Sequence, residues 1–254
     1  MSNRMRKITR VGVVLLIVSV IGNLVMFMMG RSPFNIEETT VQRSIPVDQV
    51  KELHVLAKLG AVKVIPINGT EIVVTLEGKM TKKWVKDYQL AVNDEQGRIF
   101  IEIVQKSKVH ILDLYSDFQL TIGVPNGVQL DQLRIDTDAE NISVKAVHAN
   151  KYDLTSDTGS IDMEISDGRL NVKSDTGRIT IALEQISADI NAETDSGDIS
   201  IQTAQAPDAI RTQLQADPEK IHVRLPQIQQ GAINESGPLL KLTTDTGNLT
   251  IEHK

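Results

Sequence analysis

The sequence predicts an all-β protein: a single-chain β-solenoid-like repeat domain, with coils of 18–20 residues and two short strands each, after one N-terminal transmembrane helix. Three observations predict it: an uncharged apolar run near the N-terminus, apolar/polar alternation after it, and a turn-plus-strand motif that recurs in the second half. They divide the chain into a basic cytoplasmic tail (1–10), a transmembrane signal anchor (11–29), a linker (30–44) and an extracytoplasmic β-repeat domain (45–254).

The apolar run reads VGVVLLIVSVIGNLVMFMM and contains no charged residue. At about 1.5 Å per residue, a helix of this length spans a hydrocarbon core about 30 Å thick. Four basic residues lie on the N-terminal side of the run: Arg4, Arg6, Lys7 and Arg10. Because positive flanks stay in the cytoplasm, we expect a single-pass cell-membrane protein with its N-terminus inside and its repeat domain outside.

A cleaved signal peptide is the alternative interpretation of the same run. Such a peptide has an apolar region of about 7–15 residues followed by a cleavage site of the Ala-x-Ala kind. The run here is longer, and the sequence MMGRSPF at its end offers no such site. The pattern therefore favours an uncleaved signal anchor.

Composition narrows the classes of function. The chain has no cysteine, which excludes disulfides, thiolate metal sites and a cysteine nucleophile, and is typical of a bacterial surface protein. After residue 30 it carries 23 basic and 33 acidic residues, so we expect no binding to nucleic acid, which requires Lys and Arg. Aromatic residues are 3% of the chain, so stacking platforms for bases or sugars are scarce.

The second half contains an internal repeat. Its copies read SDTGSIDM, SDTGRITI, TDSGDISI and TDTGNLTI, and a degenerate copy, TDAENISV, precedes them, with starting residues Ser156, Ser174, Thr194, Thr244 and Thr137. The glycine positions are 19, 18, 20 and 50 residues apart, and the long gap has room for a missing or distorted copy. Each copy also has an upstream apolar partner at a distance of nine residues: Leu133/Ile142, Tyr152/Ile161, Leu170/Ile179, Ile190/Ile199 and Leu240/Leu249.

The motif predicts tight turns with structural aspartates and glycines. Glycine supplies a positive φ, and Asp, Ser and Thr side chains bond to backbone amides one or two residues on. The predicted turn residues are Asp157, Gly159, Asp175, Gly177, Asp195, Gly197, Asp245 and Gly247. Two short strands cannot bury their apolar faces alone, whereas stacked units can, which favours a β-solenoid. An antiparallel meander with the same turns is the alternative.

The turn aspartates are also candidate Ca²⁺ ligands, because stacked carboxylates about 4.8 Å apart repel and a cation would relieve this. The known calcium-binding repeat is a nine-residue unit with a different pattern, so a purely structural turn is preferred. The five histidines are scattered, and the acids follow the repeat period instead of gathering in one place. We therefore expect no metal, no cofactor, no catalytic residue and no enzyme.

Three segments carry a resemblance to a known family: IPVDQVKELHVLAKLGAVKV, FQLTIGVPNGVQLDQLRIDT and the repeated S/T-D-T/S-G-x-I-x-I. From about Ile45 to its end, the chain resembles the "putative adhesin" family of β-solenoid domains of unknown function, found in bacterial envelope proteins. The N-terminal anchor is similar to that of LiaG-like proteins, which are associated with cell-envelope stress operons. The family has no established catalytic residues to carry over.

The resemblance implies a non-enzymatic envelope protein that acts in envelope stress response or surface interaction. Its partner would be an envelope protein, a wall polymer or a cationic peptide. A self-associating adhesin or scaffold is the alternative, and a polysaccharide-active β-helix enzyme is a less favoured one.

Overall fold

The computed structural model describes residues 3–29, 36–81, 88–106, 117–225 and 236–253. The chain divides into two compact units. One contains Met1–Thr39, Gly78–Gln89 and Gln105–Asp117, and the other contains Thr40–Glu77, Leu90–Val104 and Phe118–Lys254. The second unit holds the predicted repeat and most of the strands.

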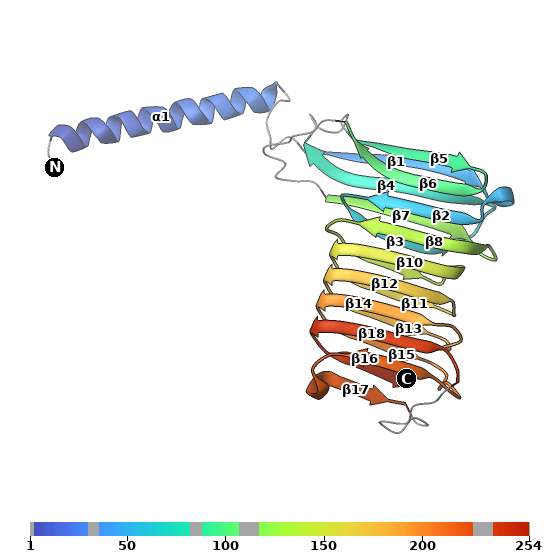
Figure 1. The fold of residues 1–254 in the computed structure, drawn as a ribbon. Coiled ribbons are helices and arrows are strands. Elements are labelled where there is room, and N and C mark those ends of the chain that lie inside the picture. Colours follow the sequence, from blue (N-terminus) through green and yellow to red (C-terminus); the bar gives the residue numbers. More distant parts are fainter. Residues whose placement is uncertain (1–2, 30–35, 82–87, 107–116, 226–235, 254) are drawn as a thin grey trace. The chain divides into compact units, whose positions relative to one another are not determined.

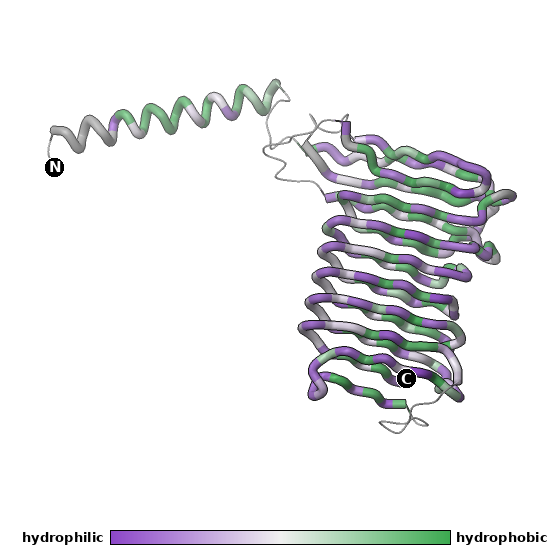
Figure 2. The backbone as a smooth tube through the Cα atoms, viewed as in Figure 1, coloured by the Kyte–Doolittle hydropathy of each residue, from purple (hydrophilic) through white to green (hydrophobic). Residues whose placement is uncertain are grey.

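The apolar run forms part of one long helix, α1 (Asn3–Met28). Within it, Arg10–Met28 is long and apolar enough to cross a membrane, and none of this span is buried. In Figure 2 most of the backbone of this span has the colour of hydrophobic residues. A signal sequence has the same properties, so the anchor remains a prediction, as does its orientation. Of the basic residues, Arg4, Arg6, Lys7 and Arg10 all lie in α1.

The strands form two sheets, stacked coil by coil in the ladder shown in Figure 1. The ten-stranded sheet contains, in spatial order, β1 (Ile36–Pro46), β4 (Glu71–Thr81), β7 (Asp117–Pro125), β3 (Ala61–Ile67), β9 (Ile142–Lys145), β11 (Ile161–Ile165), β13 (Ile179–Leu183), β15 (Ile199–Thr203), β19 (Leu249–His253) and β17 (Ile221–Arg224). The nine-stranded sheet contains β16 (Arg211–Gln215), β18 (Leu239–Thr246), β14 (Ile190–Ser196), β12 (Arg169–Thr176), β10 (His148–Thr158), β8 (Gln129–Thr137), β2 (Glu52–Ala57), β6 (Arg98–Gln105) and β5 (Tyr88–Glu95). Two short 3-10 helices are η1 (Val47–Gln49) and η3 (Pro218–Lys220).

Strands of neighbouring coils pair in parallel, which confirms the solenoid and rules out the meander. Leu133 of β8 pairs with Tyr152 of β10, and Ile142 of β9 pairs with Ile161 of β11. The remaining predicted partners continue these two columns, one in each sheet: Leu170, Ile190 and Leu240, then Ile179, Ile199 and Leu249. All ten side chains are buried. The nine-residue spacing is thus the distance between two core positions on opposite sides of one turn.

The spatial order of the coils departs from their order in the sequence. The 50-residue gap contains a further coil, β16 and β17, but this coil lies beyond the last motif copy. Strand β18 pairs with both β14 and β16, and β19 pairs with both β15 and β17. The chain therefore forms the terminal coil first and then returns to insert the last copy. Strands β2 and β3 are inserted similarly, since β2 lies between β8 and β6.

The expected linker at 30–44 is in part a strand, because β1 begins at Ile36. It is the edge of the ten-stranded sheet, next to β4. Its side chains are mostly exposed, and only Ile45 is buried. An edge strand with two solvated faces needs no apolar alternation, so its backbone pairing leaves no periodic signal in the sequence.

The repeat glycines serve close packing between coils. Among them only Gly197 has a positive φ, of 153°, so the predicted conformational reason is wrong for the other three. A Cβ on Gly177 would lie 2.1 Å from the carbonyl oxygen of Gly159, and one on Gly247 would lie 1.9 Å from that of Gly197. Any side chain here would overlap the backbone of the neighbouring coil.

In the motif copies that contain glycine, the first residue ties its coil to the preceding copy. The Ser174 hydroxyl donates to the carbonyl of Gly159 at 3.0 Å, and that of Thr194 donates to the carbonyl of Gly177 at 3.2 Å. The Thr244 hydroxyl repeats the contact with Gly197 at 2.9 Å. All three residues are buried. These bonds cross between coils, so the expectation that the hydroxyls bond to amides of their own turn is wrong.

Substitution of Ser174 tests this contact. Ser174→Ala leaves the carbonyl of Gly159 without its hydroxyl donor, and we expect the free energy of unfolding to fall by about 1 kcal/mol. Urea unfolding of the full-length protein in detergent, followed by circular dichroism, measures the change. Ser174→Thr is the matched control, because threonine makes the same bond in two other coils. Equal losses in both variants would contradict the role of the hydroxyl.

Candidate interaction surface

The turn aspartates form a ridge at the surface, and their side chains are all exposed: Asp157, Asp175, Asp195 and Asp245. A carboxylate oxygen of Asp175 lies 3.7 Å from Nζ of Lys173. In the described ranges no hydrogen bond joins any of these four carboxylates to a backbone amide, in contrast to the expected turn chemistry. Nor do the described residues contain a group of three or more His, Cys, Asp or Glu side chains that could hold a metal ion.

The residue after each repeat glycine adds a polar ladder that the sequence analysis missed. Oδ1 of Asp198 accepts hydrogen bonds from the backbone amide and the side-chain amide of Asn248, both at 2.9 Å. The backbone bond is the main reason why the pKa of Asp198 lies below its usual value. Oδ1 of Asn141 accepts from the amide of Ser160 at 2.8 Å. The recurrence of Asn, Ser and Asp at this motif position was the signal in the sequence that could have predicted these contacts.

A second polar surface lies on the outer face of the nine-stranded sheet, where β6, β2 and β8 are adjacent. Strand alternation places every second residue outward, and the parallel register aligns them in rows across the three strands. We call the resulting nine residues the outer-face grid, with the rows Arg98–Glu52–Gln132, Phe100–His54–Arg134 and Glu102–Leu56–Asp136.

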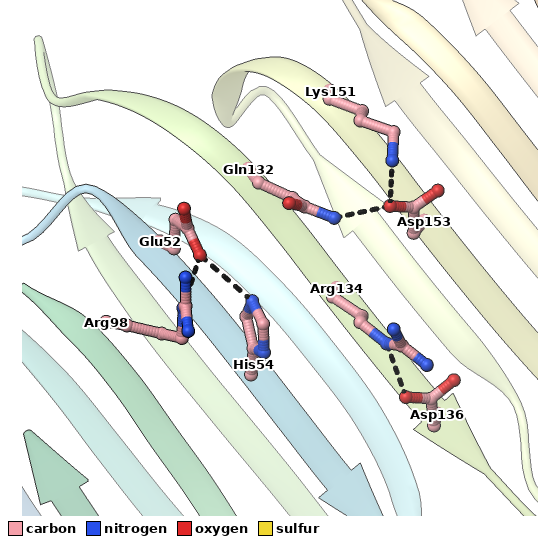
Figure 3. A network of polar contacts seen from close by, with 8 residues as sticks. All are labelled: Glu52, His54, Arg98, Gln132, Arg134, Asp136, Lys151 and Asp153. Atoms are coloured by element: carbon pink, nitrogen blue, oxygen red, sulfur yellow. Dashed lines mark hydrogen bonds and ion pairs between the residues drawn. The ribbon is translucent and has the colours of Figure 1, made fainter. Parts of the chain in front are cut away.

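Two ion pairs organise the grid (Figure 3). Nε of Arg98 lies 2.6 Å from Oε2 of Glu52, and Nε of Arg134 lies 2.9 Å from Oδ2 of Asp136. The hydrogen bond from Arg98 is the main cause that holds the pKa of Glu52 below its usual value. The bond to Asp136 likewise raises the pKa of Arg134. These opposite charges are therefore paired within the grid.

A ladder of polar contacts leads from the grid toward the repeat. Gln132 and Lys151 both donate to Oδ2 of Asp153, the lysine at 2.6 Å (Figure 3). Asn171 donates to Oδ1 of the same carboxylate at 3.2 Å, and Asn191 donates to Asn171 at 2.9 Å. The outer face of this sheet thus carries a continuous row of polar contacts over several coils.

The grid surrounds a hollow of about 260 Å³. Its lining consists of six residues of the grid, His54, Leu56, Phe100, Glu102, Arg134 and Asp136, together with Val55 and Ile101. Leu56 is 36% exposed; outside residues 11–29 and apart from Ile36, no other large hydrophobic side chain in the described ranges is that exposed. The rings of His54 and Phe100 meet edge to face, with centroids 5.1 Å apart. The hollow therefore combines an apolar floor with charged walls.

His54 occupies an unusual position beside this floor. Its Nε2 is buried and has no hydrogen bond, although it lies 3.3 Å from Oε2 of Glu52. His54 and its grid neighbour Phe100 lie on β2 and β6 and are 46 residues apart in the sequence, so no local motif joins them.

A third surface feature lies on the ten-stranded sheet, at the ends of β11, β13 and β15. It is a hollow of about 320 Å³ with mainly apolar lining, whose small side chains include Ala146, Ala182 and Ala204. Glu164 and Glu184 lie at this hollow. It has no aromatic side chain and no arginine, so it offers less varied chemistry than the outer-face grid.

Comparison with known proteins agrees with this architecture. The chain matches the family model Toastrack DUF4097 over residues 19–252. Among solved structures it is similar to a "putative cell adhesion protein" from Clostridium sporogenes, with 11% identity and a TM-score of 0.50 over 86% of this chain and 100% of that one. A "putative adhesin" from Bacteroides fragilis has 14% identity and a TM-score of 0.34, over 85% and 97% of the two chains. No curated protein matches the chain.

Proposed function

Because the chain belongs to the Toastrack DUF4097 family, we propose that it is a non-enzymatic envelope protein, held in the cell membrane by α1, that presents its solenoid to a partner outside. The observation that carries this proposal is the fully exposed apolar span Arg10–Met28 ahead of a polar-faced ladder. A membrane would cover the apolar side chains of this span. The polar outer face of the nine-stranded sheet would be the surface offered to a partner.

The basic flank of the span supports an N-terminus in the cytoplasm. The absence of cysteine from the chain makes this orientation easy to test, because each introduced cysteine is unique. We expect a membrane-impermeant maleimide to label Asp157→Cys in intact cells, and to label Ser2→Cys only after the membrane is permeabilised. The reverse pattern would overturn the orientation. Loss of the Ser2→Cys label from the mature protein would show a cleaved signal peptide.

The cellular role we propose is envelope stress response or surface interaction, which the family resemblance supports. Cross-linking in the native membrane, followed by purification of the full-length protein, identifies its neighbours. Recovery of a membrane sensor or another stress protein is the expected result and would make this chain an accessory subunit. Recovery of only the chain itself or of wall polymer would instead favour a scaffold or adhesin.

A further inference from the structure

We propose that the hollow of the outer-face grid binds a basic side chain, lysine or arginine, from an extended segment of a partner protein. The inference rests on the proposed function, because it names the chemistry by which the solenoid would recognise its partner. Three features of the grid carry it: an unpaired carboxylate, an exposed aliphatic floor and an aromatic ring beside them.

The charges of the hollow leave one negative group without a partner. Arg98 pairs with Glu52, and Arg134 pairs with Asp136. In the part of the chain that the structure describes, Glu102 has no ion pair or hydrogen bond from its side chain, although it lines the hollow. An incoming cation would therefore complete the charge balance, whereas an anion would meet an unpaired carboxylate.

The row that contains Glu102 fits the shape of a long basic side chain. Leu56 lies between Glu102 and Asp136, each one strand away, and strands in a sheet are about 4.8 Å apart. An aliphatic stem laid on Leu56 would place its charged end within reach of both carboxylates. Phe100 lines the same hollow, so its ring is available to a bound cation, and cation–π attraction acts within about 6 Å.

An extended partner segment suits the setting of the hollow. The outward rows of the grid repeat at every second residue of each strand, so a neighbouring extended chain has the same side-chain period. A compact ligand would use the floor alone, whereas an extended segment laid along the strands would also meet the other two rows of the grid. The grid thus reads as one anchoring pocket on a longer polar surface.

The test is binding of labelled heptapeptides to the full-length protein in detergent, measured by fluorescence anisotropy. The peptides Lys-Thr-Lys-Thr-Lys-Thr-Lys and Glu-Thr-Glu-Thr-Glu-Thr-Glu have the same period and opposite charge. We expect saturable binding of the lysine peptide only. Glu102→Gln should weaken it by about fivefold, as expected for one partly exposed ion pair. Leu56→Ser should weaken it further by removing the floor.

The matched control is Glu164→Gln, the same loss of charge on the other sheet, which should leave binding unchanged. Equal weakening by Glu102→Gln and Glu164→Gln would show nonspecific attraction and overturn the proposal, as would equal binding of both peptides or none of the lysine peptide. Both glutamates are surface residues, so thermal unfolding should match the parent protein. The maleimide experiment is independent of this pocket, so a failed binding test with correct labelling would reject the pocket alone.

Discussion

Replacing Gly177 with alanine is expected to lower the free energy of unfolding by about 3 kcal/mol, near the upper end of the usual cost of overpacking. The new Cβ would lie 2.1 Å from the carbonyl oxygen of Gly159 and 2.9 Å from Oγ of Ser174. The carbonyl belongs to the backbone of the neighbouring coil, so relief requires the two coils to separate locally. Urea unfolding of the full-length protein in detergent measures the loss.

Gly69→Ala is the control for this substitution. Gly69 has a φ of 148°, but a Cβ there would meet no atom within 4 Å. We therefore expect only the cost of the backbone conformation, roughly 1–3 kcal/mol. Gly177 has no positive φ, so strain of this kind cannot cause its loss, and an unchanged free energy of unfolding for Gly177→Ala would contradict the contact between coils.

Tyr152→Phe is expected to destabilise the protein by about 2 kcal/mol at neutral pH, because it leaves buried backbone groups without partners. The Tyr152 side chain is fully buried in β10. Its hydroxyl donates to the carbonyl of Val147 at 2.6 Å and accepts from the amide of Ala149 at 2.9 Å. Phenylalanine preserves the ring packing, so unfolding measurements isolate the hydroxyl. An unchanged free energy of unfolding would contradict this role.

The same residue predicts an alkaline limit to stability. Burial raises the pKa of Tyr152 from 10.0 to about 12. The unfolded chain therefore loses this proton first, so the stabilisation is complete below pH 10 and declines between pH 10 and about 12, by roughly 3 kcal/mol in total. The free energy of unfolding of Tyr152→Phe should fall less steeply over this range. Parallel profiles for the two proteins would show that other groups cause the alkaline loss.

Much of the ladder could be predicted because its determinants are local. The motif copies fix a turn every 18–20 residues, and the nine-residue pairs, such as Leu133 with Ile142, fix two core positions around each turn. Only stacking buries both positions, so the solenoid follows from the hydrophobic effect. Strand β1 could not be predicted in this way, because its stability comes from pairing with β4 and its polar residues show no alternation.

The chemistry of the turns shows where local rules are insufficient. The glycine of S/T-D-T/S-G was predicted to supply a positive φ. At Gly177 the reason for glycine is instead steric, because the backbone of Gly159 lies against it. Likewise, Ser174 has a nearby amide by local rules, but its hydroxyl reaches the neighbouring coil. Both residue types were recognised from the sequence. Their physical reasons depend on a coil that the motif itself does not contain.

The sequence by itself determined the apolar segment, the repeat, its period and the residues that form the core, because each depends on residues close together in the chain. Only the tertiary structure decided the order of the coils and the outer-face grid. Strand β18 enters between β14 and β16, and β2 enters between β8 and β6. These insertions bring His54 beside Phe100 and Arg134. The neighbours of each strand are set by backbone pairing between segments that are far apart in the chain. Because the sequence separation of such pairs is not constant, the sequence pattern does not reveal them.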